Sequence, residues 1–195
     1  MSSPIRLIVG LGNPGAEYAE TRHNAGFWFA DNLARRCGAG FRHESKFHGQ
    51  VCRIRASGGE CWLLKPATFV NRSGRSVSSL ANYYRITLRE TLVVHDELDL
   101  EAGVARLKQG GGHGGHNGLR DIMSAMGGRD FWRLRIGISR PASAAAPQVA
   151  NYVLGRPSRD EATAIESSIS DAESVLQELL EGDFQKAMQR LHGAR

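Results

Sequence analysis

Residues 5–15 read IRLIVGLGNPG, a short apolar run that leads into a glycine-rich loop. Residues 5–9 have the length and the composition of a buried strand. Further along, residues 24–36 carry apolar side chains near helical spacing, at Phe27, Phe29, Ala30, Leu33 and Ala34. The sequence therefore predicts a strand, a loop and a helix in that order, which is how an α/β fold begins.

Strands and helices continue to alternate along the chain. We predict further strands at 51–56, 61–65, 91–95, 104–108 and 131–138, a hairpin turn at Gly58-Gly59, and an edge strand at 149–154 after a loop at 143–147. Helices are expected at 73–84, 119–126, 159–181 and near 184–191, with Gly182 ending the third. The fold class is α/β, a single domain over residues 1–195 with a twisted mixed β-sheet flanked by helices on both faces.

The composition narrows the setting in which the protein works. A length of 195 residues suits one domain. We find no run of the ~20 apolar residues that a membrane span needs and no export signal, so a cytoplasmic protein is expected. The three cysteines, Cys37, Cys52 and Cys61, are odd in number and contain no C-x-x-C pair, which favours reduced thiols.

The net charge of +5 is unevenly distributed. Residues 156–195 hold five Lys+Arg and eight Asp+Glu, whereas residues 1–155 hold twenty and twelve. A basic body of this kind favours a polyanionic partner such as nucleic acid.

Two glycine-rich loops suggest a dinucleotide-binding site and a metal site, and the sequence favours neither. Residues 10–15 match G-x-G-x-x-G, the pattern of a dinucleotide site, but Asp31 falls inside the predicted helix and not at the end of a second strand. In residues 110–118, His113 and His116 lie among six glycines and would allow metal ligation. Six glycines are explained more simply by backbone conformation, and we expect no metal.

Polar side chains follow the predicted strands where the strands end. These are Asn13, His23, Asp96 and Asn117. In open α/β sheets such ends line the ligand cleft, and His23 lies in a polar turn that a substrate can reach.

Several segments together carry a family resemblance. They are VGLGNPG (9–15), Tyr18, TRHNAG (21–26), Phe69 with Asn71, HDELD (95–99), residues 110–121 and RLRIGI (133–138). In this order, and over nearly the whole chain, the sequence resembles the bacterial-type peptidyl-tRNA hydrolases. The resemblance implies a hydrolase for the ester between a peptide, or an N-blocked amino acid, and the terminal ribose of tRNA. It also implies no metal and no cofactor.

The resemblance further implies roles for individual residues. His23 corresponds to the general base, Asp96 to the carboxylate that orients it, and Asn13 to the residue that recognises the peptide side of the bond. The tRNA acceptor end and the peptide would be bound by a larger set: Tyr18, Phe69, Asn71, Asn117, His116, Lys108 and Arg135, with Arg133 as a weaker phosphate ligand. We expect the chain to act as a monomer.

Two departures from the family pattern bear on the pocket. Val70 stands where many members carry Met, and residues 140–146 differ from the polar loop often found there. A binding module that holds RNA without cutting it remains the main alternative, and an NAD-dependent oxidoreductase is a weaker one.

Overall fold

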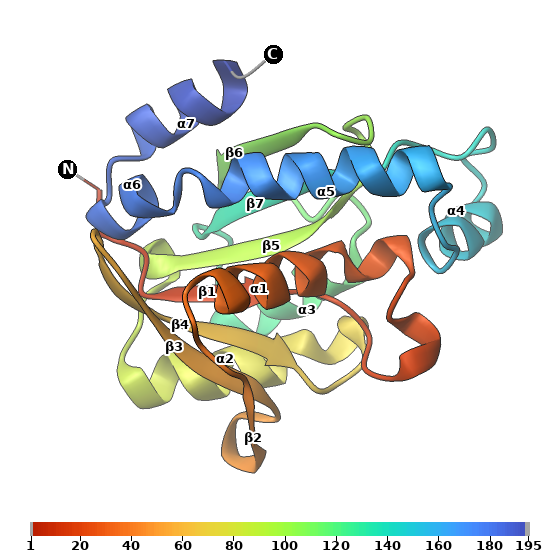
Figure 1. Ribbon diagram of the computed structural model, residues 1–195. Coiled ribbons are helices and arrows are strands. Elements are labelled where there is room, and N and C mark those ends of the chain that lie inside the picture. Colours follow the sequence, from red (N-terminus) through yellow and green to blue (C-terminus); the bar gives the residue numbers. More distant parts are fainter. Residues whose placement is uncertain (1, 194–195) are drawn as a thin grey trace.

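The computed structural model describes residues 2–193, which contain one seven-stranded sheet of order β2-β3-β4-β1-β5-β7-β6 (Figure 1). The central strands run parallel: β4 (Gly59–Pro66), β1 (Leu7–Gly10), β5 (Thr91–Glu97) and β7 (Trp132–Gly137). The remaining strands pair antiparallel: β2 (Arg42–Glu44) and β3 (Gly49–Ala56) on one side, β6 (Ala105–Gln109) at the other edge. The prediction of a mixed sheet is confirmed.

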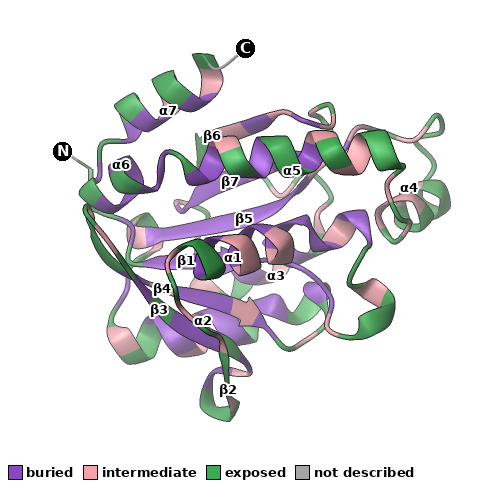
Figure 2. Cartoon of the chain, viewed as in Figure 1, coloured by how far each residue is buried: buried purple, intermediate pink, exposed green. Residues whose placement is uncertain are grey.

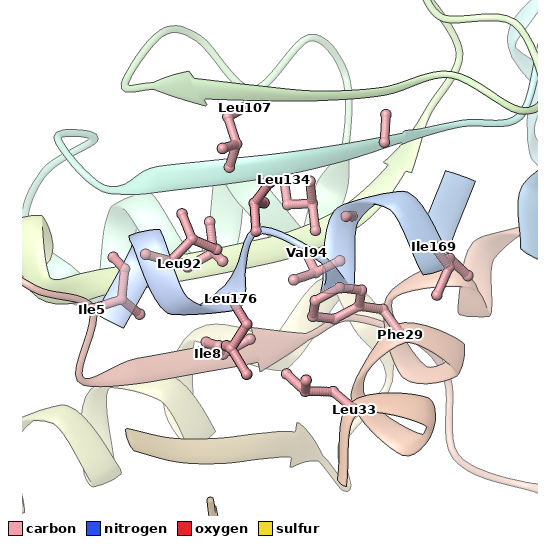
Figure 3. Close-up of a cluster of buried hydrophobic side chains, with 14 of the residues drawn as sticks. Ile5, Ile8, Phe29, Leu33, Leu92, Val94, Leu107, Leu134, Ile169 and Leu176 are labelled. Atoms are coloured by element: carbon pink, nitrogen blue, oxygen red, sulfur yellow. The ribbon is translucent and has the colours of Figure 1, made fainter. Parts of the chain in front are cut away.

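Helices cover both faces of the sheet, as predicted. One face packs against α1 (Ala25–Arg36), α5 (Arg159–Glu173), α6 (Leu176–Glu181) and α7 (Phe184–Gly193). The other packs against α2 (Ser73–Tyr84) and α3 (Asn117–Met126). Figure 3 shows Phe29 and Leu33 of α1 and Ile169 of α5 among the side chains that fill the first core. Buried residues accordingly concentrate in the strands and on the inner sides of the helices (Figure 2).

The first strand and first helix approach so closely that two glycines are required. A Cβ on Gly10 would lie 2.3 Å from the Gly26 carbonyl oxygen, and one on Gly26 would lie 2.4 Å from the Leu11 nitrogen. The chain between them forms two short 3-10 helices, η1 (Ala16–Tyr18) and η2 (Arg22–Asn24). At Gly10 the missing side chain thus serves helix packing, and η2 is placed beside the carboxyl end of β1.

Two expectations are corrected, and one strand was not predicted. Residues 149–154 form no edge strand, because they belong mostly to α4 (Ala146–Val153), which has Pro147 in its first turn. The helix expected over 159–181 is interrupted: α5 ends before Ser174, and Val175 leaves the helical region with φ −100° and ψ 12°. The short strand β2 was not predicted, because its three residues are polar and carry no apolar alternation.

Candidate active site

A cavity of about 790 Å³ opens at the carboxyl ends of β1 and β5. Eight of the ten predicted site residues line it: Asn13, Tyr18, His23, Phe69, Asn71, Asp96, His116 and Asn117. Lys108 and Arg135 lie outside its wall. The sequence therefore identified the residues that the fold gathers at one place.

Half-buried His23 and buried Asp96 form a hydrogen-bonded pair in the wall of the cavity. The His23 Nδ1 lies 2.9 Å from both carboxylate oxygens of Asp96. A carboxylate only accepts hydrogen bonds, so Nδ1 carries the proton and the neutral ring keeps its lone pair on Nε2. Burial alone would lower the pKa of His23, but the charge and hydrogen bond of Asp96 outweigh burial and raise the pKa above its ordinary value.

A second imidazole holds the same carboxylate. His116 caps the N-terminus of α3, where its Nδ1 accepts the Leu119 N–H at 3.4 Å, so its Nε2 carries the proton and donates to Asp96 Oδ1 at 2.9 Å. Burial opposes ionisation of Asp96, yet the two imidazoles hold the pKa of this carboxyl well below its usual range.

The side chains of His23, Asp96 and His116 are also close enough to be considered as metal ligands, with their ligand atoms within 4.8 Å of one another. A metal would need a free lone pair on His116 Nε2. That nitrogen holds a proton, because the Leu119 N–H occupies Nδ1. The hydrogen bonds favour a proton-carrying cluster over a cation site.

Asn13 is oriented by three hydrogen bonds. Its backbone N–H donates to Asn24 Oδ1 at 2.9 Å, and its carbonyl accepts from Asn24 Nδ2 at 3.0 Å. Its side-chain Oδ1 accepts the Val70 N–H at 2.8 Å. A backbone N–H can only donate, so this bond fixes the amide orientation and leaves the Asn13 NH₂ group for the cavity.

The mouth of the cavity combines amides with apolar walls. Asn71 and Asn117 are exposed there, and the Tyr18 and Phe69 rings meet edge to face with centroids 6.1 Å apart. The opposite wall is an apolar stripe of α4 and the residue after it: Ala146, Val149, Ala150, Val153 and Leu154. No residue of α4 is buried, which leaves this stripe open to a ligand (Figure 2).

The predicted phosphate ligands lie on the edge strand β6 and on its neighbour β7. The register pairs Lys108 with Arg133 and Arg106 with Arg135, so all four side chains start from one face. Lys108 is exposed and Arg135 half-buried. Arg133 is only 4% exposed, so the expectation that it binds phosphate as a weaker candidate is wrong.

Sequence reasoning missed three residues that support the site. His95 is buried and adjoins Asp96 in the sequence, Arg133 is buried against His95, and Arg22, next to His23, is buried beneath α4. Arg22 donates to the Tyr152 carbonyl at 3.1 Å and to Glu161 at 3.0 Å, and its guanidinium lies 4.0 Å from the Tyr152 ring centroid. A signal was available for Arg133, since a strand covered on both faces leaves little room for a solvated arginine.

A histidine–carboxylate pair beside amide donors, in a cleft at the carboxyl edge of a mixed sheet, defines a small α/β hydrolase. The family model described as Peptidyl-tRNA hydrolase matches residues 7–195, and the chain belongs to this family. The Methylobacillus flagellatus peptidyl-tRNA hydrolase is 54% identical over 188 residues, 96% of each chain. The Cupriavidus necator peptidyl-tRNA hydrolase is 51% identical and covers 98% of this chain and 100% of its own.

Solved structures agree with this assignment. The peptidyl-tRNA hydrolase crystal structure from Acinetobacter baumannii superimposes with a TM-score of 0.93 at 47% identity, covering 98% of this chain and 96% of its own. A peptidyl-tRNA hydrolase complexed with N-propanol gives 0.94 at 46% identity, with the same coverage. The oxidoreductase alternative is wrong, and Asp31 indeed lies within α1, where it pairs with Lys65.

Proposed function

We propose that the chain hydrolyses the ester between a peptide, or an N-blocked aminoacyl group, and the terminal ribose of tRNA, with His23 as the general base. The observation that carries the proposal is the Asp96 contact with His23 Nδ1. It leaves the basic lone pair on Nε2 of a residue that lines the cavity. A base positioned in this way can take a proton from water near neutral pH.

The proposed reaction proceeds in two steps. Water attacks the ester carbonyl carbon while its proton moves to His23 Nε2, and a tetrahedral oxyanion forms. The bond to the ribose oxygen then breaks, and the imidazolium returns its proton to that oxygen. The products are tRNA with a free hydroxyl and the carboxylic acid of the peptide, which releases its remaining proton to solvent and becomes a carboxylate. The Asn71 and Asn117 amides at the cavity mouth supply donors for the carbonyl oxygen as its charge develops.

Selection of the blocked substrate is assigned to Asn13. Its NH₂ group remains for the cavity because its oxygen is bonded to Val70. A peptide group presents a carbonyl oxygen to this donor, whereas a free aminoacyl ammonium presents only further donors. The donor therefore favours N-acylated over free aminoacyl-tRNA.

The substitution Asn13→Asp tests this assignment sharply, because a carboxylate still accepts from Val70 but cannot donate. We expect the rate ratio of N-acetylated to free aminoacyl-tRNA to fall by about tenfold or more, as loss of one hydrogen bond to substrate allows. Asn13→Ala should lower the ratio similarly, and Asn82→Ala, on the exposed side of α2, is the control. A ratio in Asn13→Asp equal to that of the wild type would contradict the assignment.

The remaining parts of the proposal concern the cellular location, the oligomeric state and the need for a metal or cofactor. Within residues 2–193 no helix is long and apolar enough to cross a membrane. We propose action in the cytoplasm by a monomer, because one chain supplies every group named in the two steps. Those steps assign each proton transfer to His23 and require no metal or cofactor.

A further inference from the structure

Arg133 lies at the centre of a buried network beside the catalytic carboxylate. Its Nε donates to His95 Nε2 at 3.2 Å, and its Nη1 donates to the Gly112 carbonyl at 2.8 Å and more weakly to the Gly110 carbonyl at 3.5 Å. Its Nη2 lies 3.7 Å from a Glu97 carboxylate oxygen, and its side chain is only 5% exposed. One guanidinium therefore contacts both neighbours of Asp96 and the loop that leads to His116.

The contact with His95 continues to Asp96 itself. The His95 Nδ1 donates to the Asp96 carbonyl at 2.7 Å, so its Nε2 is the acceptor that faces Arg133. Burial, followed by the charges of His116 and Arg133, holds the pKa of His95 well below its ordinary value. A neutral ring matches the donor and acceptor roles that this chain of hydrogen bonds requires.

The glycine loop of residues 110–115 has a flexible backbone, so its conformation depends on contacts with other parts of the structure. Gly110, Gly111, Gly114 and Gly115 have φ between 57° and 90°, and glycine loses more conformational freedom on ordering than any other residue. This loop ends at His116 and Asn117, which begin α3 and line the cavity. The bonds from Arg133 to Gly110 and Gly112 connect the loop to β7, and the bond from Arg133 to His95 extends this connection to β5, which carries Asp96.

We propose that Arg133 is a positioning residue that fixes the glycine loop, and with it His116 and Asn117, relative to Asp96 on β5. This proposal rests on the function proposed above, because positioning His116 and Asn117 affects turnover only if the reaction takes place in this cavity. A lysine cannot substitute, since its single ammonium does not reproduce the planar fork that serves His95 and the loop carbonyls together.

The test compares Arg133→Lys with Arg89→Lys, an exposed arginine paired with Asp130. We expect Arg133→Lys to lower kcat on N-acetylaminoacyl-tRNA by about 10- to 100-fold, because a misplacement of about 1 Å can cost that much. The KM and the salt dependence of tRNA affinity should stay unchanged. The melting temperatures of the variants separate a loss of kcat from unfolding. His95→Leu removes the hydrogen bond between β5 and Arg133 and should lower kcat similarly.

A double variant distinguishes positioning from a general loss of stability. If Arg133 acts through the loop, Arg133→Lys should cost little further in an Asn117→Ala background, because the two changes share one mechanism. Multiplicative losses would overturn the proposal, as would unchanged kcat with weaker tRNA binding and a flatter salt slope. Failure of the proposed function is a different result: wild-type protein would not turn over, or His23→Ala would remain fully active.

Discussion

Asp96 accepts hydrogen bonds from two imidazoles, and the two bonds serve different purposes. The bond from His23 fixes the tautomer of the His23 ring, whereas the bond from His116 ties the start of α3 to the same carboxylate. A buried carboxylate needs such donors, because leaving it unpaired costs far more than the net gain from pairing it.

The pH dependence of catalysis follows from the direction of the His23 shift. Only neutral His23 can accept a proton, and its pKa is raised, so kcat/KM should rise with pH through a midpoint above the ordinary value of about 6.5. In Asp96→Asn the opposing charge is gone and burial remains, so the midpoint should move to lower pH. A pH–rate profile of both proteins measures this, and an unmoved midpoint would contradict the coupling.

The sequence predicted the side chains that line the cavity better than the residues that support them. Asn13 and Asp96 follow strands whose ends meet at one edge of a sheet, which the alternation of strands and helices already implies. Arg133 was predicted as a weaker phosphate ligand, but it is buried. Its burial depends on the glycine loop, which the alternation within β7 does not show. The available signal was the position of this strand in a sheet covered on both faces.

In secondary structure, the main wrong prediction concerns α4, which was expected to be an edge strand. Its apolar residues suggested an edge strand, yet they recur at helical spacing and follow Pro147, so the helix was readable. Its apolar stripe faces the cavity and its other side is held by Arg22 against Tyr152. A helix fixed on one side and open on the other is suited to contact the apolar side chains of a peptide.

We therefore expect Val149→Ser to raise KM for N-acetylleucyl-tRNA about three- to tenfold, because a partly buried apolar contact contributes about 1 kcal/mol. N-acetylglycyl-tRNA should be unaffected, since it has no side chain to lose the contact. Gln148→Ser, on the same helix but outside the cavity wall, is the control. Equal changes for both substrates would argue against a side-chain contact at α4.

The charge of the molecule is consistent with a tRNA substrate that extends past the cavity. Lys108 is exposed beside the glycine loop, Arg135 lies on the same face, and both are outside the cavity that we propose binds the ester. This separation is what a substrate with a small reactive end and a large polyanionic body requires.

Replacing Lys108 or Arg135 with alanine should lower affinity about equally across tRNAs and flatten the slope of log affinity against log salt by about 1, because each phosphate contact releases counterions. Arg42→Ala, at the opposite edge of the sheet, should leave the slope unchanged. Binding titrations over a range of salt decide the matter, and wild-type slopes in both variants would place the phosphate contacts elsewhere.

The central claim is that His23 and Asp96 act as one catalytic unit, and steady-state turnover of N-acetylaminoacyl-tRNA tests it most directly. His23→Ala should lose about 100- to 10,000-fold in kcat while tRNA affinity and the melting temperature stay close to wild type. Asp96→Asn should lose less, and the double variant should lose little more than His23→Ala alone. Multiplicative losses, or losses accounted for by weaker tRNA binding, would contradict the claim.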